Sequence, residues 1–294
     1  MSLLDAIAAH IAEATQQAFH ISSHTAMGGG CINSAYRLDG DNKSYFVKIN
    51  SADRLNMFEA EAAGLADIAQ SYTIKVPAPV CWHVIGDSSF LVLENMEFGS
   101  SGSHAMQTFG QQLAHMHQTT SDHFGWRMDN TIGSTPQVNH RSDNWVQFWR
   151  EQRLAFQLEQ AAQKGYRGRL QHDGEKLLVC LDHFFERYHP QPSLLHGDLW
   201  SGNYAIDTNG DPVIYDPAVY YGDREADIAM TELFGGFGQS FYSAYNEIFP
   251  LDKDYAVRKT LYNLYHIINH LNLFGGAYLS QAEAMIARLL SECR

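Results

Sequence analysis

The stretch Leu194-Leu195-His196-Gly197-Asp198-Leu199-Trp200-Ser201-Gly202-Asn203 decides the fold of this chain. An apolar pair, typical of a short buried strand, leads into an irregular segment that contains two glycines. Within that segment Asp198 and Asn203 stand five positions apart, and Asp216 follows thirteen residues after Asn203. A carboxylate can accept a proton, and amide and carboxylate oxygens are ligands for divalent cations. The stretch therefore pairs a candidate base with two candidate metal ligands.

This order matches the catalytic loop of kinases, in which the aspartate, here Asp198, accepts the proton of the substrate hydroxyl. Asn203 would reach a Mg²⁺ ion, and Asp216 occupies the place of the metal-binding Asp-Phe-Gly segment. A His-Gly-Asp triplet alone is a weak signal, and Asp216-Pro217 can also be the start of an ordinary turn. The hypothesis therefore needs support from the upstream sequence.

A lysine and a glutamate upstream have the order that ATP binding requires. Lys48 ends an apolar strand, and Glu61 follows thirteen residues later on the next predicted helix. In kinases such a glutamate holds the lysine in an ion pair while the lysine binds the α- and β-phosphates. A lysine at a strand end is usually solvated, and Glu61 could be one of many acids on a helix surface. The order of all the motifs along the chain favours the kinase interpretation.

Two further segments complete the predicted nucleotide site. A glycine run lets the backbone approach phosphates closely, although such runs are more often flexible turns. The run comprises Gly28, Gly29 and Gly30. The segment Leu93-Glu94-Asn95-Met96 is typical of a hinge, where backbone groups at Glu94 and Met96 would bond the adenine edge.

The predicted fold class is α+β, a bilobal protein-kinase-like fold with a small strand-rich N-terminal lobe and a larger helical C-terminal lobe. A polar linker at 99–103 sets the boundary, so residues 1–98 form the nucleotide-binding lobe and 99–294 the catalytic and substrate lobe. A ligand is expected in the cleft between the lobes. Periodicity predicts strands at 34–38, 44–49, 76–85 and 89–94, a hairpin within 194–215, and helices around 4–11, 53–69, 109–117, from 145, 177–188, 255–274 and 281–292.

The kind of kinase follows from what the loop lacks. Gly197 stands where protein kinases carry the arginine that answers a phosphorylated activation loop, and no Ala-Pro-Glu segment follows Asp216. The chain therefore lacks the charge needed for that switch, which favours a small-molecule kinase.

Beyond these motifs, the sequence resembles the fructosamine kinases, also called ketosamine kinases, which are relatives of the aminoglycoside phosphotransferases. The resemblance runs over nearly the whole chain. It is carried by Gly28–Ile32, Phe58–Glu61, Phe124–Trp126, Asp129-Asn130, Ile132-Gly133, Pro136-Gln137, Asn139, Asp143–Trp145, Arg153-Leu154, His196–Asn203, Asp216–Ala218, Tyr221–Asp227, Tyr265, Asn269-His270 and Phe274–Gly276. Trp200 and Asp223-Arg224-Glu225 separate the pattern from generic aminoglycoside or choline kinases.

The resemblance implies a ketosamine substrate, the rearranged adduct of a sugar on an amine, with ATP and Mg²⁺ as cofactors. The family phosphorylates the hydroxyl on the third sugar carbon, and the product then falls apart to release the amine. This reaction promotes deglycation of the amine. The adduct can be a small molecule or protein-bound, and the sequence leaves open which sugar is preferred.

Several polar and aromatic residues are candidates for contacting the substrate. Trp200 would offer an aromatic face to the sugar, or it packs in the core. His270 would border the substrate cleft, and its spacing from His266 on one helix face could also bind a metal.

A second set of candidates precedes a buried helix. Asp223 and Glu225 could bind the amine of the substrate, or simply cap the helix and pair with Arg224. Asp227 is interpreted as structural, because the segment that follows it has the pattern of a buried helix.

The cysteines give two expectations. Cys31 lies in the glycine run, where exposure and nearby positive charge favour a thiolate, so its oxidation would distort the nucleotide loop and inhibit the enzyme. The alternative is an inert small residue in a turn. Cys31, Cys81, Cys180 and Cys293 are far apart and form no CxxC pair, which predicts neither a disulfide framework nor a zinc site and favours a reducing compartment.

Charge and hydropathy limit the partners. The chain of 294 residues has 33 acidic and 20 basic residues, a net charge of −13, which argues against a nucleic-acid partner but not against a nucleotide. It shows no secretory signal at its N-terminus, and no apolar run approaches the ~20 residues that cross a bilayer. We expect a cytoplasmic protein without a membrane partner, and nothing in the sequence demands more than a monomer.

Three rival functions remain at this point. The acceptor could be another small hydroxyl compound, such as an aminoglycoside or choline. The chain could be a catalytically inactive kinase-like binding module, although Lys48, Asp198, Asn203 and Asp216 are all intact. A metal-dependent phosphatase or nuclease could use the two aspartates, but the strand-rich first lobe would then have no role.

Overall fold

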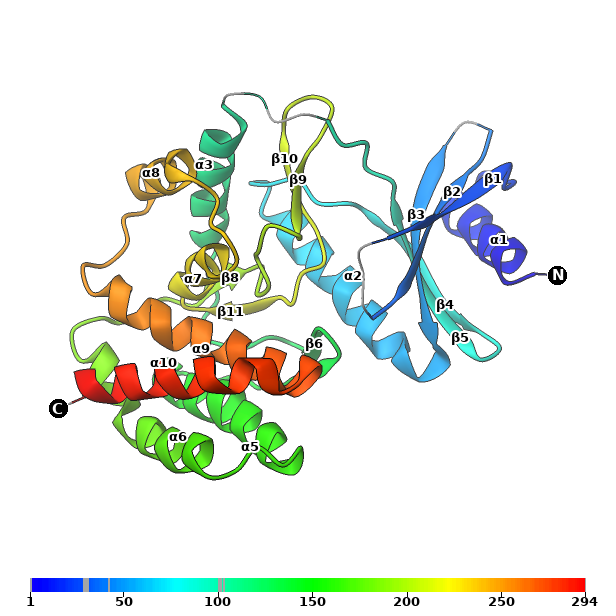
Figure 1. The fold of residues 1–294 in the computed structure, drawn as a ribbon. Coiled ribbons are helices and arrows are strands. Elements are labelled where there is room, and N and C mark those ends of the chain that lie inside the picture. Colours follow the sequence, from blue (N-terminus) through cyan, green and yellow to red (C-terminus); the bar gives the residue numbers. More distant parts are fainter. Residues whose placement is uncertain (1, 29–31, 42, 100–101, 103, 294) are drawn as a thin grey trace. The chain divides into compact units, whose positions relative to one another are not determined.

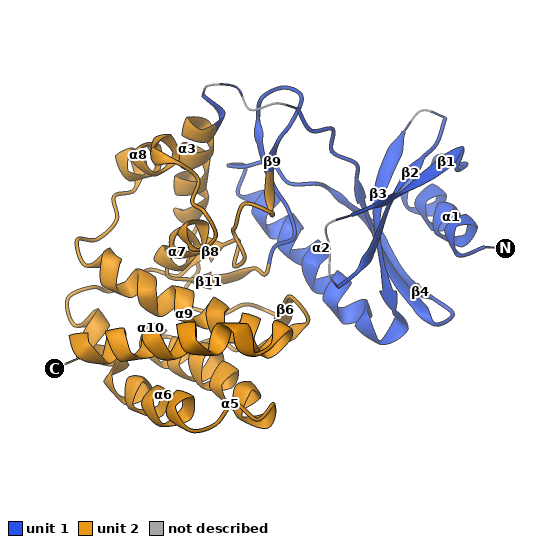
Figure 2. Ribbon diagram, viewed as in Figure 1, with its two compact units in different colours: residues 1–105, 205–217 blue, residues 106–204, 218–294 orange. Residues whose placement is uncertain are grey.

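The computed structural model describes residues 2–28, 32–41, 43–99, 102 and 104–293. The chain forms two compact units, one from 1–105 with 205–217 and the other from 106–204 with 218–294 (Figure 2). The sequence predicts a single boundary between residues 98 and 99, with the hairpin in the second lobe. The hairpin instead belongs to the first unit, because its backbone forms β-bridges there, between Asp207 and Phe98 and between Val213 and Lys75. Pairing between segments so distant in sequence leaves no local signal.

The first unit is an antiparallel sheet with a helix on each face (Figure 1). Its five strands have the order β1-β2-β3-β5-β4. Its elements are α1 (Leu3–Thr15), β1 (Ser23–Met27), β2 (Ser34–Asp39), β3 (Ser44–Ser51), α2 (Leu55–Gln70), β4 (Pro79–Ile85), β5 (Ser88–Glu94) and the hairpin of β9 (Tyr204–Ile206) and β10 (Pro212–Ile214). The predicted strands and both helices are therefore present.

The alternation of side chains along β5 explains the two faces. Phe90 and Val92 pack in one cluster with Ile7 of α1, while Leu91 packs in another with Phe58 of α2. Successive side chains of a strand point to opposite faces, so a continuous apolar strand needs a covering layer on each side. The sheet thus fixes β3 and the side chains it carries.

The second unit is mostly helical, with two short two-stranded sheets. Helix α9 is buried along most of its length and packs against α5, α7 and α10. The elements are α3 (Ala105–His117), β6 (Asn130–Ile132), β7 (Thr135–Gln137), α4 (Trp145–Trp149), a π-helical segment (Arg150–Ala155), α5 (Phe156–Gln163), α6 (Arg169–Cys180), β8 (Ser193–Leu195), β11 (Tyr220–Gly222), α7 (Glu225–Leu233), α8 (Gln239–Ile248), α9 (Tyr255–Phe274) and α10 (Leu279–Glu292). None of the helices in the described ranges combines the length and apolar character that a membrane-spanning segment needs.

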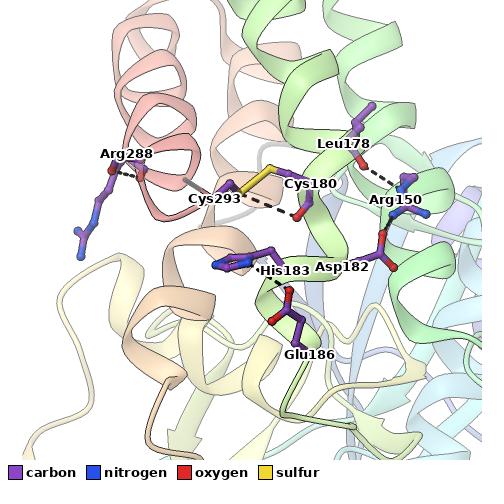
Figure 3. The surroundings of a disulfide bond; sticks show 9 residues. Arg150, Leu178, Cys180, Asp182, His183, Glu186, Arg288 and Cys293 are labelled. Atoms are coloured by element: carbon purple, nitrogen blue, oxygen red, sulfur yellow. Dashed lines mark hydrogen bonds and ion pairs between the residues drawn. A yellow bond between two sulfur atoms is a disulfide. The ribbon is translucent and has the colours of Figure 1, made fainter.

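A disulfide joins Cys180, at the end of α6, to Cys293, just after α10 (Figure 3). The expectation that the cysteines do not pair is therefore wrong, and the argument for a reducing compartment loses its basis. Packing of α10 on α6 brings the two Cα atoms to 6.4 Å across 113 residues of sequence, a proximity that cysteine spacing cannot reveal. Cys81 is a buried free thiol, and burial raises its pKa to about 11.

Loss of this disulfide is expected to destabilise the protein. A Cys293→Ser variant should lose about 2–4 kcal/mol of unfolding free energy, because its unfolded chain regains the freedom of a long open loop. Urea unfolding with and without reductant measures the effect. Reductant should bring the wild type down to the level of the variant and leave the variant unchanged. A wild-type midpoint that does not respond to reductant would contradict the prediction.

Candidate active site

In the first unit, β3 and α2 bring a buried lysine against a carboxylate. Lys48 is 6% exposed, and its Nζ lies 2.6 Å from Oε1 of Glu61. The same Nζ contacts Oδ1 of Asp216, which follows β10. The ion pair predicted from the sequence is therefore present, and a third candidate residue joins it within the same unit.

The charges of this cluster depend on one another. Burial acts to lower the pKa of Lys48, but Asp216 and Glu61 outweigh it, so the pKa stays above its ordinary value and the lysine is positively charged. Burial also raises the pKa of Glu61, which Lys48 opposes. The lysine thus holds its charge inside the unit because two carboxylates face it.

Asp216 has an unusual backbone conformation. Its φ is 56°, in the left-handed region that residues other than glycine seldom adopt. Its side chain remains 47% exposed despite the contact with Lys48. Such strain persists where surrounding structure imposes it, often at functional sites. Asp216 thus presents an accessible carboxylate in a fixed backbone geometry.

In the second unit, strand β8 leads directly into the loop that carries Asp198. The backbone N–H groups of His196 and Gly197 donate to the two carboxylate oxygens of Asp227, at 2.7 and 2.8 Å. Gly197 has a φ of 83°, and a Cβ there would lie 2.1 Å from the carbonyl oxygen of Ala218. Only glycine fits this position, which gives a steric reason for the missing arginine.

Asn203 closes the loop onto Asp198. Its Nδ2 donates to the backbone oxygen of Asp198 at 2.8 Å and to Oδ2 at 3.1 Å. Because the amide nitrogen is turned toward Asp198, the amide oxygen is directed elsewhere, and the hydrogen bonds of the Asn203 side chain among the described residues all come from its nitrogen. The pair therefore has a fixed carboxylate and an available oxygen ligand.

Asp227, on the first turn of α7, is supported from behind by His117. Nε2 of His117 lies 3.2 Å from Oδ2 of Asp227, and its Nδ1 lies 2.8 Å from the hydroxyl of Tyr245. Burial acts to raise the pKa of Asp227, but His117 and the donors of the loop hold it below its ordinary value. The structure supports the interpretation of Asp227 as structural, whereas His117 was given no role from sequence. Its position on the buried face of α3 was the available signal.

Trp200 lies on an exposed aromatic surface. The residue is 38% exposed. Its ring lies edge-on to that of Phe234, with 6.2 Å between ring centres, and the ring centre of Phe234 lies 5.1 Å from that of His270. Burial in the core is therefore excluded for Trp200. His270 also contacts Phe274 and Tyr278, and burial lowers its pKa, so the imidazole is neutral near pH 7. Phe234 was not a sequence candidate.

The buried bonds of Asp223 and Glu225 favour the structural alternative over binding of the substrate amine, since Asp223 accepts from the backbone N–H of Glu225 at the start of α7. Both side chains are fully buried. Asp223 accepts from the hydroxyls of Tyr188 and Tyr262 at 2.9 and 2.5 Å. Glu225 pairs with Arg258 at 2.7 Å rather than with its sequence neighbour Arg224. Their carboxylates are committed to partners within the second unit.

The remaining nucleotide candidates lie in the first unit. No atom of the described residues lies within 4 Å of a Cβ placed at Gly28. Glu94 is exposed and accepts from the backbone N–H of Ala78 at 3.3 Å, and Met96 is half-buried. Gly29, Gly30 and Cys31 lie outside the described residues, so the glycine-run and redox hypotheses stay predictions. Among the residues that are described, no group of three or more His, Cys, Asp or Glu side chains could hold a metal ion.

His266, on α9, gives a prediction for stability against pH. It is 4% exposed, Nδ1 has no hydrogen-bond partner in the described part of the chain, and burial, His270 and Arg153 lower its pKa to about 3, against the weaker opposing effect of Asp227. In the unfolded chain the imidazole has an ordinary pKa of about 6.5. Burial of the neutral imidazole therefore costs no stability above that pH, and the folded protein becomes less stable as the pH falls below it. The loss is about 1.4 kcal/mol per pH unit.

Replacing His266 by leucine should therefore flatten the pH dependence between about pH 6 and 4. Urea unfolding of wild type and variant across that range gives the slope of unfolding free energy against pH for each. The difference between the two slopes removes the contribution of other titrating groups. Parallel curves would contradict the assignment.

Comparison with known proteins decides the family. The sequence model of the fructosamine kinases matches residues 3–292. The chain belongs to the fructosamine kinase family. A probable ketoamine kinase from a Synechocystis species is 47% identical over 285 residues, covering 97% of this chain and 96% of the relative. The chloroplastic protein-ribulosamine 3-kinase of Arabidopsis thaliana is 43% identical, covering 92% of this chain and 83% of the relative.

Solved structures agree with membership of the fructosamine kinase family. One from Haemophilus somnus that carries the name fructosamine-3-kinase has a TM-score of 0.89 and 31% identity, covering 97% of this chain and 96% of its own. One from Thermobifida fusca with the same name has a TM-score of 0.85 and 32% identity, covering 98% and 99%. An aminoglycoside phosphotransferase, at 15% identity and a TM-score of 0.63 with 97% and 98% covered, shares the protein-kinase-like fold alone.

Proposed function

We propose that this protein is an ATP-dependent kinase that phosphorylates the 3-hydroxyl of ketosamines and so promotes deglycation. Family membership supports the reaction, since a relative with 43% identity is named a protein-ribulosamine 3-kinase. The observation that carries it is the Asp198–Asn203 pair held by Asp227, because phosphoryl transfer needs a fixed base beside an oxygen ligand.

The residues present fit Mg²⁺ and ATP. Mg²⁺ prefers oxygen ligands and is usually held by one or two carboxylates together with the phosphates of the nucleotide. Asn203 has an amide oxygen that accepts no hydrogen bond from the described residues, and Asp216 has an exposed carboxylate. When bound, the ion would neutralise charge on the phosphates. Lys48, kept charged by Glu61, would bind the α- and β-phosphates, and Gly28, Glu94 and Met96 would border the nucleotide.

In this proposal Asp198 accepts a hydrogen bond from the attacking hydroxyl and finally its proton. The amide of Asn203 fixes the rotation of that carboxylate, and Asp227 fixes the backbone beneath it. Because the transition state of phosphoryl transfer is loose, positioning and charge stabilisation supply most of the rate.

We place the substrate on the aromatic surface of Trp200, Phe234 and His270 rather than on Asp223 and Glu225. Aromatic faces stack on sugar rings and attract cations, and a ketosamine carries a protonated secondary amine beside its sugar. A neutral His270 does not repel that amine. Because ATP is an intracellular reactant, we propose a cytoplasmic location, and a monomer stays a prediction from the sequence.

The test is ATP consumption with Mg²⁺ over fructosyl-lysine, ribulosyl-lysine, kanamycin and choline, with the phosphorylated carbon located by NMR. Turnover confined to the two ketosamines and phosphate on the third carbon would support the proposal. Turnover on kanamycin or choline instead would show that the acceptor is not a ketosamine. ATP binding without turnover on any compound would favour an inactive binding module.

A further inference from the structure

A buried polar network lies behind the loop that carries Asp198. Its junction is Ala218, two residues after Asp216 in the chain. The N–H of Ala218 donates to the carbonyl oxygen of His196 at 2.8 Å, and its own oxygen accepts from Nε2 of Gln137 at 3.1 Å. The next carbonyl, of Val219, accepts from Nδ2 of Asn130 at 2.8 Å. The backbone that faces the loop is therefore held by side-chain amides.

These amides form a directed network in which Gln137 and Asn139 both donate to Asn130. The oxygen of Asn130 accepts from Nε2 of Gln137 at 2.8 Å and from Nδ2 of Asn139 at 2.9 Å. All three amide side chains are at most 9% exposed. An amide has a donor end and an acceptor end, so the orientation of each member is fixed by its neighbours.

Arg153 sets that direction at one end. Its Nη2 donates to the amide oxygen of Asn139 at 2.6 Å. A guanidinium can only donate, so Asn139 must present its oxygen to Arg153 and its NH₂ group to Asn130. At the other end the hydroxyl of Tyr265 donates to Oε1 of Gln137 at 2.7 Å, which turns the NH₂ group of Gln137 toward Ala218.

The environment of Arg153 is costly for a charge. It is fully buried, and it forms no ion pair with a carboxylate in the described ranges. Its guanidinium donates to the backbone oxygen of Val138 at 2.5 Å and lies 4.2 Å from the ring centre of Tyr220 and 4.6 Å from that of Phe148. Burying a cation without a counter-ion costs free energy unless hydrogen bonds replace its lost hydration. The hydrogen bonds of Arg153 are therefore important to the structure.

The backbone around Arg153 is also exceptional, since it belongs to the π-helical segment Arg150–Ala155. Such segments are rare and occur frequently at functional sites. The π-helical turn places the guanidinium between Asn139 and Tyr220, and β11, which carries Tyr220, pairs with β8, which leads into the loop of Asp198.

We propose that Arg153 is a positioning residue for the phosphoryl transfer. Through Asn139 and Asn130 it orients the donor that fixes the carbonyl of Val219. The adjoining residue, Ala218, donates to His196 in the loop that carries Asp198. The proposal rests on the proposed function for its effect on turnover, but not for its effect on the loop.

The experiment compares Arg153→Met with wild type in two readouts. In kinetics with the accepted ketosamine, kcat should fall about 30–100-fold while the affinity for MgATP stays within about 3-fold, because the base is displaced and the nucleotide residues are not. In hydrogen exchange, peptides covering 193–204 and 218–224 should exchange about 10-fold faster. Arg150→Met is the matched control, since Arg150 lies in the same π-helical segment but bonds Leu178 and Asp182 instead.

A second variant separates positioning from bulk stability. Asn139→Asp gives the buried cation a carboxylate partner but removes the donor to Asn130, so the link from Arg153 to Asn130 is broken. We expect a folded protein with the same fall in kcat and the same faster exchange; if Arg153→Met does not fold, this variant carries the test. Wild-type exchange in the folded variants, or wild-type kcat beside faster exchange, would overturn the proposal. Absence of ketosamine turnover in the wild type would instead overturn the proposed function, and the exchange data would still decide whether Arg153 holds the loop.

Discussion

Replacement of Asp198 by asparagine is expected to lower kcat by about 10³-fold, which is within the range that a general base contributes. Asparagine keeps the size of the side chain and an oxygen that can accept from Asn203, so the loop should keep its shape. It cannot take the proton of the attacking hydroxyl. The dissociation constant of MgATP, measured by calorimetry, should change by less than about 3-fold, because Lys48 and Asp216 are untouched.

Ser201→Ala is the matched control for this variant. Ser201 lies exposed in the same loop and contributes none of the hydrogen bonds that hold it. Its kcat should stay within about 3-fold of wild type. Retention of a tenth or more of the activity by Asp198→Asn would sink the assignment of the base.

Replacement of Asp227 by asparagine is expected to damage both stability and turnover. The carboxylate offers one oxygen to the N–H of His196 and the other to the N–H of Gly197. An amide has a single acceptor oxygen, so one of these buried donors would face an NH₂ group. The free energy of unfolding should fall by about 2–4 kcal/mol, and kcat by about 100-fold because the loop shifts.

The stability difference between wild type and Asp227→Asn should depend on pH. The pKa of Asp227 is lowered in the folded protein, so its contribution is complete above the ordinary aspartate pKa of about 4 and is lost as pH falls further. Asp182→Asn, which breaks an exposed pair with Arg150, should cost no more than about 0.5 kcal/mol. Equal unfolding curves for Asp227→Asn and wild type near pH 7 would contradict the role given to Asp227.

The residues that perform the proposed chemistry were predictable because their spacing follows from the reaction. Lys48 and Glu61 lie where a strand followed by a helix brings them together, and the ion pair is confirmed. Asp198 and Asn203 are close enough in sequence for a single loop to join them. The local sequence therefore predicts a site when its residues lie on one loop, or on one strand and the helix that follows it.

Contacts between distant segments were not predictable. Asp223 and Glu225 have the composition of an amine-binding site, and only the packing of α7 on α9 shows that Arg258 and Tyr262 occupy them. The pairing of Cys180 with Cys293 depends in the same way on α6 and α10. Phe234 lacked any polar signal, and only its contacts with the rings of Trp200 and His270 draw attention to it.

The prediction of secondary structure is wrong for helix α6, which buries only a narrow stripe of residues. Helix α6 begins at Arg169 and ends at Cys180, whereas the pattern predicted a helix over 177–188. The buried residues of α6 are Leu170, Gly174 and Leu177, and a glycine in that stripe hides the period. A Cβ at Gly174 would lie 2.9 Å from the side chain of Leu158, so a larger residue there would need that side chain to shift.

The composition of the first unit has a consequence for synthesis. Strands β1 to β5 are complete by residue 94, but the hairpin that belongs to the same unit begins only at residue 205. Translation proceeds at about 5–20 residues per second, so the growing chain spends several seconds or more with this unit unfinished. In that interval Lys48 has only one of its two carboxylates, and Lys75 lacks Asp207, its partner at 2.6 Å. The unit that starts the protein is therefore completed late, when residue 217 has left the ribosome.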